Sequence, residues 1–132
     1  MKNVLNKILG IVILVAIAGT ATAQSQVTFQ LNLKQQMKDS AFVPPQHSVV
    51  VTGNQLPFTS LNSFKMRDTE PVDSVYSAQV RFPSSEIGKT LKFKFEIKRP
   101  KKNNLTERQP RLLRIEEGTN TLRPDYFNSF AR

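Results

Sequence analysis

Apolar and polar residues alternate with a period of two through much of the chain. The alternation is clearest in residues 91–98 (LKFKFEIK), and it recurs in 27–34 and 76–82. A period of two predicts β-strands that bury one face and expose the other. In residues 91–98 it predicts that the two phenylalanines point into a core and that Lys94 between them points to solvent.

Shorter segments complete a predicted set of seven to eight short strands. These candidates lie at 48–52, 64–66, 105–107, 112–115 and 119–122. Proline, glycine and asparagine mark turns roughly every ten residues, and only residues 35–40 suggest a helical turn. The pattern predicts an all-β fold, an immunoglobulin-like antiparallel β-sandwich.

The first 23 residues have the pattern of a secretory signal peptide. Two lysines precede an apolar run at 8–18, and small residues at 21 and 23 form a cleavage pattern. The run is shorter than the roughly 20 residues that a membrane-spanning helix needs, so we expect no stable membrane anchor after cleavage near Ala23. The sequence therefore predicts an exported protein, periplasmic or secreted, with a domain at 24–128 and a frayed end at 129–132.

Composition narrows the classes of function. The chain has no Cys, no Trp and a single His, His47, and its formal net charge is +9. A thiol nucleophile and a cysteine metal site are excluded, and no motif supplies His47 with a nucleophile and an orienting carboxylate. Asp68, Glu70 and Asp73 lie close together in the sequence but do not form a recognised calcium loop. We expect no enzyme activity, no cofactor and no metal site.

Six short segments follow one another in an informative order. They are VTFQLN at 27–32, VVVTGN at 49–54, DSVY at 73–76, GKTLKFKF at 88–95, ERQPR at 107–111 and YFN at 126–128. Together they resemble the starch-binding domain of carbohydrate-binding module family 20, or a near relative with the same sandwich. The resemblance spans almost the whole chain after residue 24. It implies a non-catalytic module and an α-glucan ligand, such as starch or a maltooligosaccharide.

The resemblance also implies where such a ligand would bind. Members of the family stack sugar rings on exposed tryptophans, with help from a lysine and an asparagine. In this chain the lysine is Lys94, Pro110 replaces the asparagine just before Arg111, and the only aromatic residue near the first tryptophan position is Phe58. The implied carbohydrate-binding residues are therefore Phe58, Lys94 and Arg111, in a largely degenerate site. Phe58 either presents its ring to a sugar or folds back and plugs the end of the sandwich.

Two other functions stay open from the sequence. Basic residues concentrate in 89–102, and Lys92, Lys94 and Lys98 share a predicted solvent face. They either bind an acidic polymer or form a solvated face that protects an edge strand. The lack of neighbouring aromatic residues argues against nucleic acid. Alternatively, the sandwich has no sugar ligand and binds a protein partner by strand addition at an exposed sheet edge.

Overall fold

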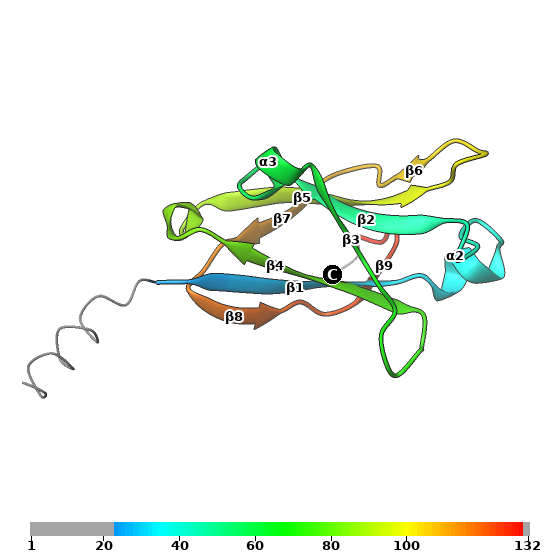
Figure 1. Cartoon of the computed structure of the whole chain (residues 1–132), viewed down its shortest axis with the longest axis horizontal. Helices are drawn as coiled ribbons and strands as arrows, with labels where there is room; N and C mark the ends of the chain where they lie inside the picture. Colours follow the sequence, from blue (N-terminus) through cyan, green and yellow to red (C-terminus); the bar gives the residue numbers. More distant parts are fainter. Residues whose placement is uncertain (1–22, 131–132) are drawn as a thin grey trace, which may run out of the picture.

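The computed structural model describes residues 23–130, so the predicted signal peptide lies almost entirely outside the described residues. These residues form two β-sheets packed face to face (Figure 1). Sheet A has the order β4–β1–β8, with β9 also paired to β1, and contains β1 (Ser25–Asn32), β4 (Val75–Phe82), β8 (Gly118–Thr121) and β9 (Asp125–Tyr126). Sheet B has the order β3–β2–β5–β6, with β7 also paired to β5, and contains β2 (Ser48–Gly53), β3 (Ser63–Lys65), β5 (Thr90–Lys98), β6 (Leu105–Thr106) and β7 (Arg111–Arg114).

Helical structure in the described residues is limited to three short turns. They are α2 (Lys34–Lys38), α3 (Phe58–Leu61) and the 3₁₀ turn η1 (Ser84–Glu86). Within residues 23–130, none of these helices has the length and apolar character needed to cross a membrane.

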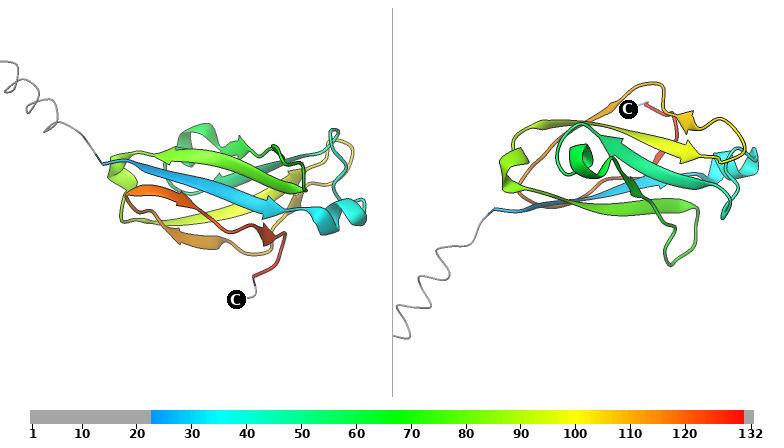
Figure 2. Two further views of the ribbon diagram at one scale, coloured as in Figure 1. Left: turned by 90° about the horizontal axis from the view of Figure 1, so that it is seen from below. Right: turned by 45° about the horizontal axis from the view of Figure 1, so that its top comes forward.

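The long strands pair in the way that the period-two pattern requires. β1 and β4 are antiparallel, from the pair Ser25 and Phe82 to the pair Asn32 and Val75, and β2 and β5 are also antiparallel. β1 additionally pairs in parallel with β8 and β9, and Figure 2 shows β1 between β4 and β8. The all-β sandwich is therefore confirmed, with nine strands in residues 23–130 instead of seven to eight, but it is not wholly antiparallel as predicted. The parallel pairs arise because the chain crosses from sheet B to sheet A after β7, so no hairpin forces an antiparallel neighbour.

The core lies between the sheets, and β1 and β5 contribute a large part of it through their inward residues. Phe29 of β1 and Phe93 of β5 pack edge to face, with ring centroids 5.0 Å apart. Phe95 is buried as well, whereas Lys94 lies on the outer face of sheet B. The predicted direction of these side chains is confirmed.

Candidate functional site

The three residues that the family resemblance implies for carbohydrate binding lie in three different places. Phe58 is in α3, at one end of the core. Lys94 is on the outer face of sheet B. Arg111 pairs with Phe93 in the register between β7 and β5, and its side chain therefore shares the inner face with that phenylalanine. The structure does not bring the three together into one site.

Phe58 is buried, with only 1% of its surface exposed. Its ring packs edge-on against Phe29 and Phe64, at centroid distances of 6.0 and 5.3 Å. Gly53 makes room for it, because a Cβ atom at this glycine would lie 2.8 Å from the Phe58 ring. Burial of an aromatic ring contributes about 1.5–3 kcal/mol, which explains why the loop folds back. The prediction of an exposed sugar platform at Phe58 is therefore wrong, and the ring plugs the end of the sandwich.

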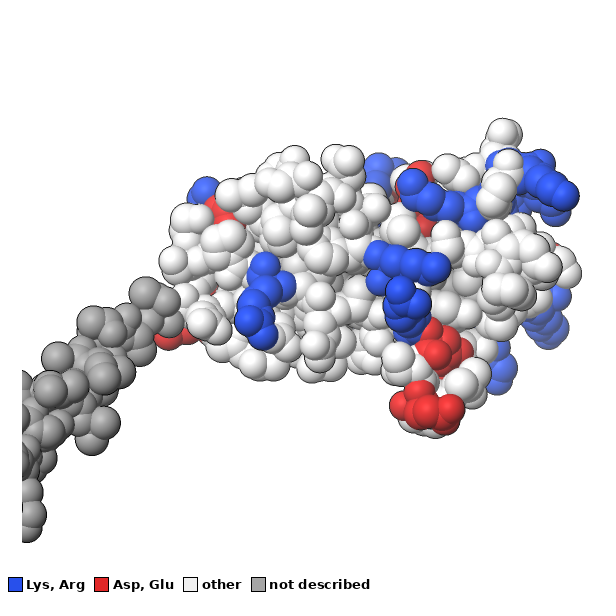
Figure 3. Space-filling view, in the orientation of Figure 1, with Lys and Arg blue, Asp and Glu red and all other residues white. Residues whose placement is uncertain are grey.

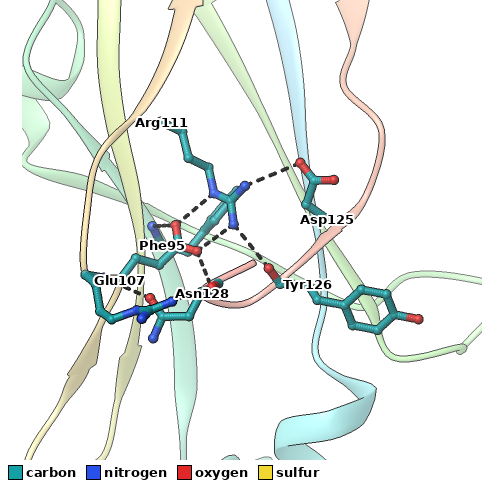
Figure 4. A network of polar contacts seen from close by, with 7 residues as sticks. Phe95, Glu107, Arg111, Asp125, Tyr126 and Asn128 are labelled. Carbon is teal, nitrogen blue, oxygen red and sulfur yellow. Dashed lines mark hydrogen bonds and ion pairs between the residues drawn. The ribbon is translucent and has the colours of Figure 1, made fainter. Parts of the chain in front are cut away.

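Arg111 is the centre of a polar network that links β7 to the C-terminal segment (Figure 4). Its guanidinium donates to both carboxylate oxygens of Glu107, at 2.9 and 2.6 Å. It also donates to Asp125 Oδ2 at 3.3 Å and to the Tyr126 carbonyl at 3.1 Å. Only 11% of the Arg111 side chain is exposed. This arginine is thus positioned by its own contacts before any ligand arrives.

Glu107 explains why the arginine turns inward. This carboxylate is 2% exposed. It accepts hydrogen bonds from the backbone N–H of Phe95 at 3.2 Å and of Asn128 at 2.8 Å, in addition to those from Arg111. A buried carboxylate without a positive partner is strongly unfavourable, so Arg111 compensates the charge that the fold buries at Glu107.

Two aromatic rings flank the guanidinium. The Arg111 guanidinium carbon lies 5.4 Å from the ring centroid of Phe95 and 4.8 Å from that of Phe130. These are cation–π distances. The N–H of Ser129 donates to the Tyr126 carbonyl at 3.0 Å. Ser129 and Phe130 therefore contact the network, and the last two residues of the segment predicted to fray lie outside the described residues.

A groove of about 580 Å³ opens beside this network, between β7 and the segment that contains β8 and β9. We call it the Arg111 groove. Apolar and polar side chains both line it: Phe93, Gln109, Pro110, Arg111, Leu112, Leu113, Leu122, Arg123, Asp125, Ser129 and Phe130. Of the residues that line this groove, Arg111 is the one that the sequence analysis selects as a binding residue. Asp125 and Phe130 carry no motif, and only the three-dimensional contacts with Arg111 reveal them.

Comparison with known proteins gives one kind of match. No protein-family model matches the chain, and no curated protein matches it. Solved structures do. The γ-CGTase of alkalophilic Bacillus clarkii, a cyclodextrin glucanotransferase, matches 80% of this chain with a TM-score of 0.55 and 20% sequence identity. The chain corresponds to only 15% of that enzyme's length, so the likeness shows a shared β-sandwich fold.

The other candidates from the sequence have structural roles. Nδ1 of His47 accepts the Val43 backbone N–H at 2.9 Å and so fixes its own loop. Asp68 braces the loop before β4 by accepting the backbone N–H groups of Asp73 and Ser74, at 3.3 and 2.8 Å. Within residues 23–130, no three His, Cys, Asp or Glu side chains gather closely enough to hold a metal ion.

Two side chains away from the groove have shifted pKa values. The hydrogen bond from Lys89 lowers the pKa of Glu86, against desolvation that raises it, and the Leu56 N–H adds to the lowering. Desolvation raises the pKa of Tyr76, and the nearby charge of Asp68 adds to this. Neither residue lines the Arg111 groove.

Proposed function

We propose that this chain is an exported, non-catalytic carbohydrate-binding module that binds an α-glucan chain in the Arg111 groove. Two likenesses support a carbohydrate ligand. Six sequence segments resemble the family 20 starch-binding domain, and the fold resembles part of a glucanotransferase. The predicted signal peptide supports the exported location.

The observation that carries the proposal is the pairing of apolar surface with fixed polar groups in one groove. A sugar ring presents a face of C–H groups that packs on aromatic or aliphatic side chains, while its hydroxyls need oriented polar partners. In the groove, Phe130 and Leu122 offer the apolar surface, and Asp125 offers an acceptor. Arg111 contributes by orienting Asp125 and Phe130, because most of its own donors are already used.

The expected affinity is low. The chain has no tryptophan, so no large indole platform is available for a sugar ring. A dissociation constant in the millimolar range corresponds to a binding free energy of about −4 kcal/mol, which suits one small platform and a few hydrogen bonds. A module of this kind would depend on several weak contacts along the polymer.

The test is an NMR titration of the purified protein with maltoheptaose at millimolar concentration. We expect localised shifts in the backbone amides of Leu113, Asp125 and Phe130. The Phe130→Ala variant should weaken these shifts, whereas Leu61→Ala, which removes an exposed apolar side chain from α3, should leave them unchanged. The absence of any localised shift, or shifts only outside the groove, would contradict the proposal.

A second candidate function is binding of a protein strand at the free edge of β4. Among the described residues, the outer side of this strand is bridged only at Ser77, which exchanges backbone hydrogen bonds with Arg67 at 2.8 and 2.9 Å. Backbone groups alternate sides along a strand, so Gln79 and Arg81 present free groups on the same edge. Gln79→Pro removes one of these donors and should abolish capture of a partner that binds by strand addition.

A further inference from the structure

The outer face of sheet B carries a concentration of positive charge. Lys92, Lys94 and Lys98 point outward from β5. The strand register places two more cations on the same face. Val50 of β2 pairs with both Lys65 of β3 and Glu96 of β5, so Lys65 lies on the face that carries Glu96. Arg114 of β7 pairs with Thr90 of β5, which also lies on this face. We call Lys65, Lys92, Lys94, Lys98 and Arg114 the basic face. Figure 3 shows Lys and Arg side chains gathered at the end of the molecule where β5 turns towards β6.

Most of these cations have no acidic partner. Among the described residues, only Lys98 forms an ion pair, with Glu96 at 3.9 Å. Glu96 also accepts a hydrogen bond from Thr106 Oγ1 at 3.0 Å. Neighbouring strands lie about 4.8 Å apart, and alternate residues along a strand about 6.7 Å apart, so these like charges repel one another. An anionic ligand on this face would relieve that repulsion.

We propose that the basic face binds an anionic polysaccharide, a glycan that carries carboxylates along its length. Lys92 and Lys98 are six residues apart, which spans about 20 Å along a strand and suits an extended polymer. A lysine ammonium offers three donors on a flexible stem and can follow carboxylates that are not rigidly placed.

Hydroxyl side chains lie among the cations on the same face. Thr52 pairs with Lys94 and with Ser63, and Thr106 pairs with Glu96. Thr106 and Thr52 already donate, to Glu96 at 3.0 Å and to the Lys94 carbonyl at 3.5 Å, so their hydroxyl oxygens can accept from the hydroxyls of a sugar. The Ser63 hydroxyl can both donate and accept. The face therefore combines charge for carboxylates with neutral polar groups for the rest of the glycan.

Two other polyanions fit this face less well. Among the outward residues of sheet B there is no aromatic side chain in the described structure, and single-stranded nucleic acids rely on aromatic stacking. Leu112, 67% exposed beside Lys92, is the one large apolar side chain of these strands that projects from the face. Membrane surfaces recruit proteins through larger apolar contacts together with charge.

The proposal does not depend on α-glucan binding, because the Arg111 groove faces the other side of β5. Its test is the affinity of the purified protein for polygalacturonate at 50 and 200 mM salt. Three or four neutralised charges would give a slope of about −2 to −3 in log affinity against log salt, so the affinity should fall by about 15- to 60-fold. Salt-independent binding, or no binding at 50 mM salt, would overturn the proposal.

Charge variants locate the site. Lys92→Gln with Lys94→Gln should weaken binding by about threefold to tenfold, since an exposed ion pair contributes up to about 1 kcal/mol. Glu96→Gln removes the acid from the face and should strengthen binding. The matched control is Lys34→Gln with Lys38→Gln in α2, which changes the net charge equally on exposed residues that follow a strand of sheet A.

The outcomes are distinguishable. Retained affinity in the Lys34 and Lys38 control, with a loss in the Lys92 and Lys94 variant and unchanged melting temperatures in both, would support the site. Equal losses in the two double variants would overturn it, because net charge alone would then explain the binding. Tighter binding of poly(dT), or of vesicles containing phosphatidylglycerol, than of polygalacturonate would overturn the proposed ligand class.

Discussion

Replacing Arg111 with alanine should destabilise this protein far more than replacing an ordinary surface arginine. The substitution would leave the Glu107 carboxylate buried without its positive partner, with only the backbone donors of Phe95 and Asn128. Removing one partner of a buried ion pair costs about 3–5 kcal/mol. Because the two backbone donors persist, we expect about 3 kcal/mol, and loss of the contacts with two aromatic rings adds about 1 kcal/mol. Against a typical total of about 5–15 kcal/mol, this is a large fraction of the stability.

Urea unfolding followed by circular dichroism measures this free energy directly. Arg123→Ala is the matched control, because its side chain is 80% exposed and pairs with Asp125 at 3.6 Å; it should cost less than about 1 kcal/mol. Arg111→Lys keeps the charge but loses the two-pronged contact, so its loss should be intermediate. Hydrogen exchange at the Asn128 amide should become faster in Arg111→Ala. Equal stability of the two alanine variants, within about 0.5 kcal/mol, would refute the reasoning.

Two further predictions concern stability. Phe95→Ala should cost about 3–5 kcal/mol and largely unfold the protein, whereas Lys94→Ala should leave the melting temperature nearly unchanged, which thermal unfolding of the two variants measures. The reverse result would mean that the β5 register is inverted. Because the folded protein lowers the pKa of Glu86, the ionised side chain contributes to the free energy of unfolding when the pH is above the usual glutamate pKa. This contribution is lost as the pH falls below about 4.5. In Glu86→Gln, the free energy of unfolding, measured by urea titrations between pH 3 and pH 7, should therefore fall less steeply as the pH is lowered. An unchanged pH dependence would contradict this assignment.

The period-two pattern was sufficient to predict β1 and β5 because each of these strands buries one complete face. Alternation in β5 determines which side chains enter the core, whatever strands lie next to it. The last strands are different. β8 and β9 pair with β1, which lies about ninety residues earlier in the chain, and their own residues are exposed or only partly buried, so they show little hydrophobic pattern.

The site was harder to predict for a related reason. An arginine in a short strand is expected to point to solvent, but Arg111 points inward because Glu107 is buried four residues earlier. The partners that complete the network, Asp125 and Asn128, follow fourteen or more residues later. No local spacing signals that contact. The family resemblance selected Arg111 as a ligand residue, but it could not show that the fold already uses its guanidinium.

Lys94 is the residue at which the family resemblance and the geometry lead to different expectations. The resemblance implies that this lysine contacts an α-glucan together with Arg111, yet the two side chains lie on opposite faces of sheet B. Contacts in the Arg111 groove depend on packing and hydrogen bonds, which salt affects little, whereas the basic face depends on charge, which salt screens. Lys94→Gln should therefore weaken polygalacturonate binding and leave the maltoheptaose shifts of Asp125 and Phe130 unchanged. If the substitution instead reduced those shifts, the α-glucan would contact the outer face of β5, and the groove would not be its site.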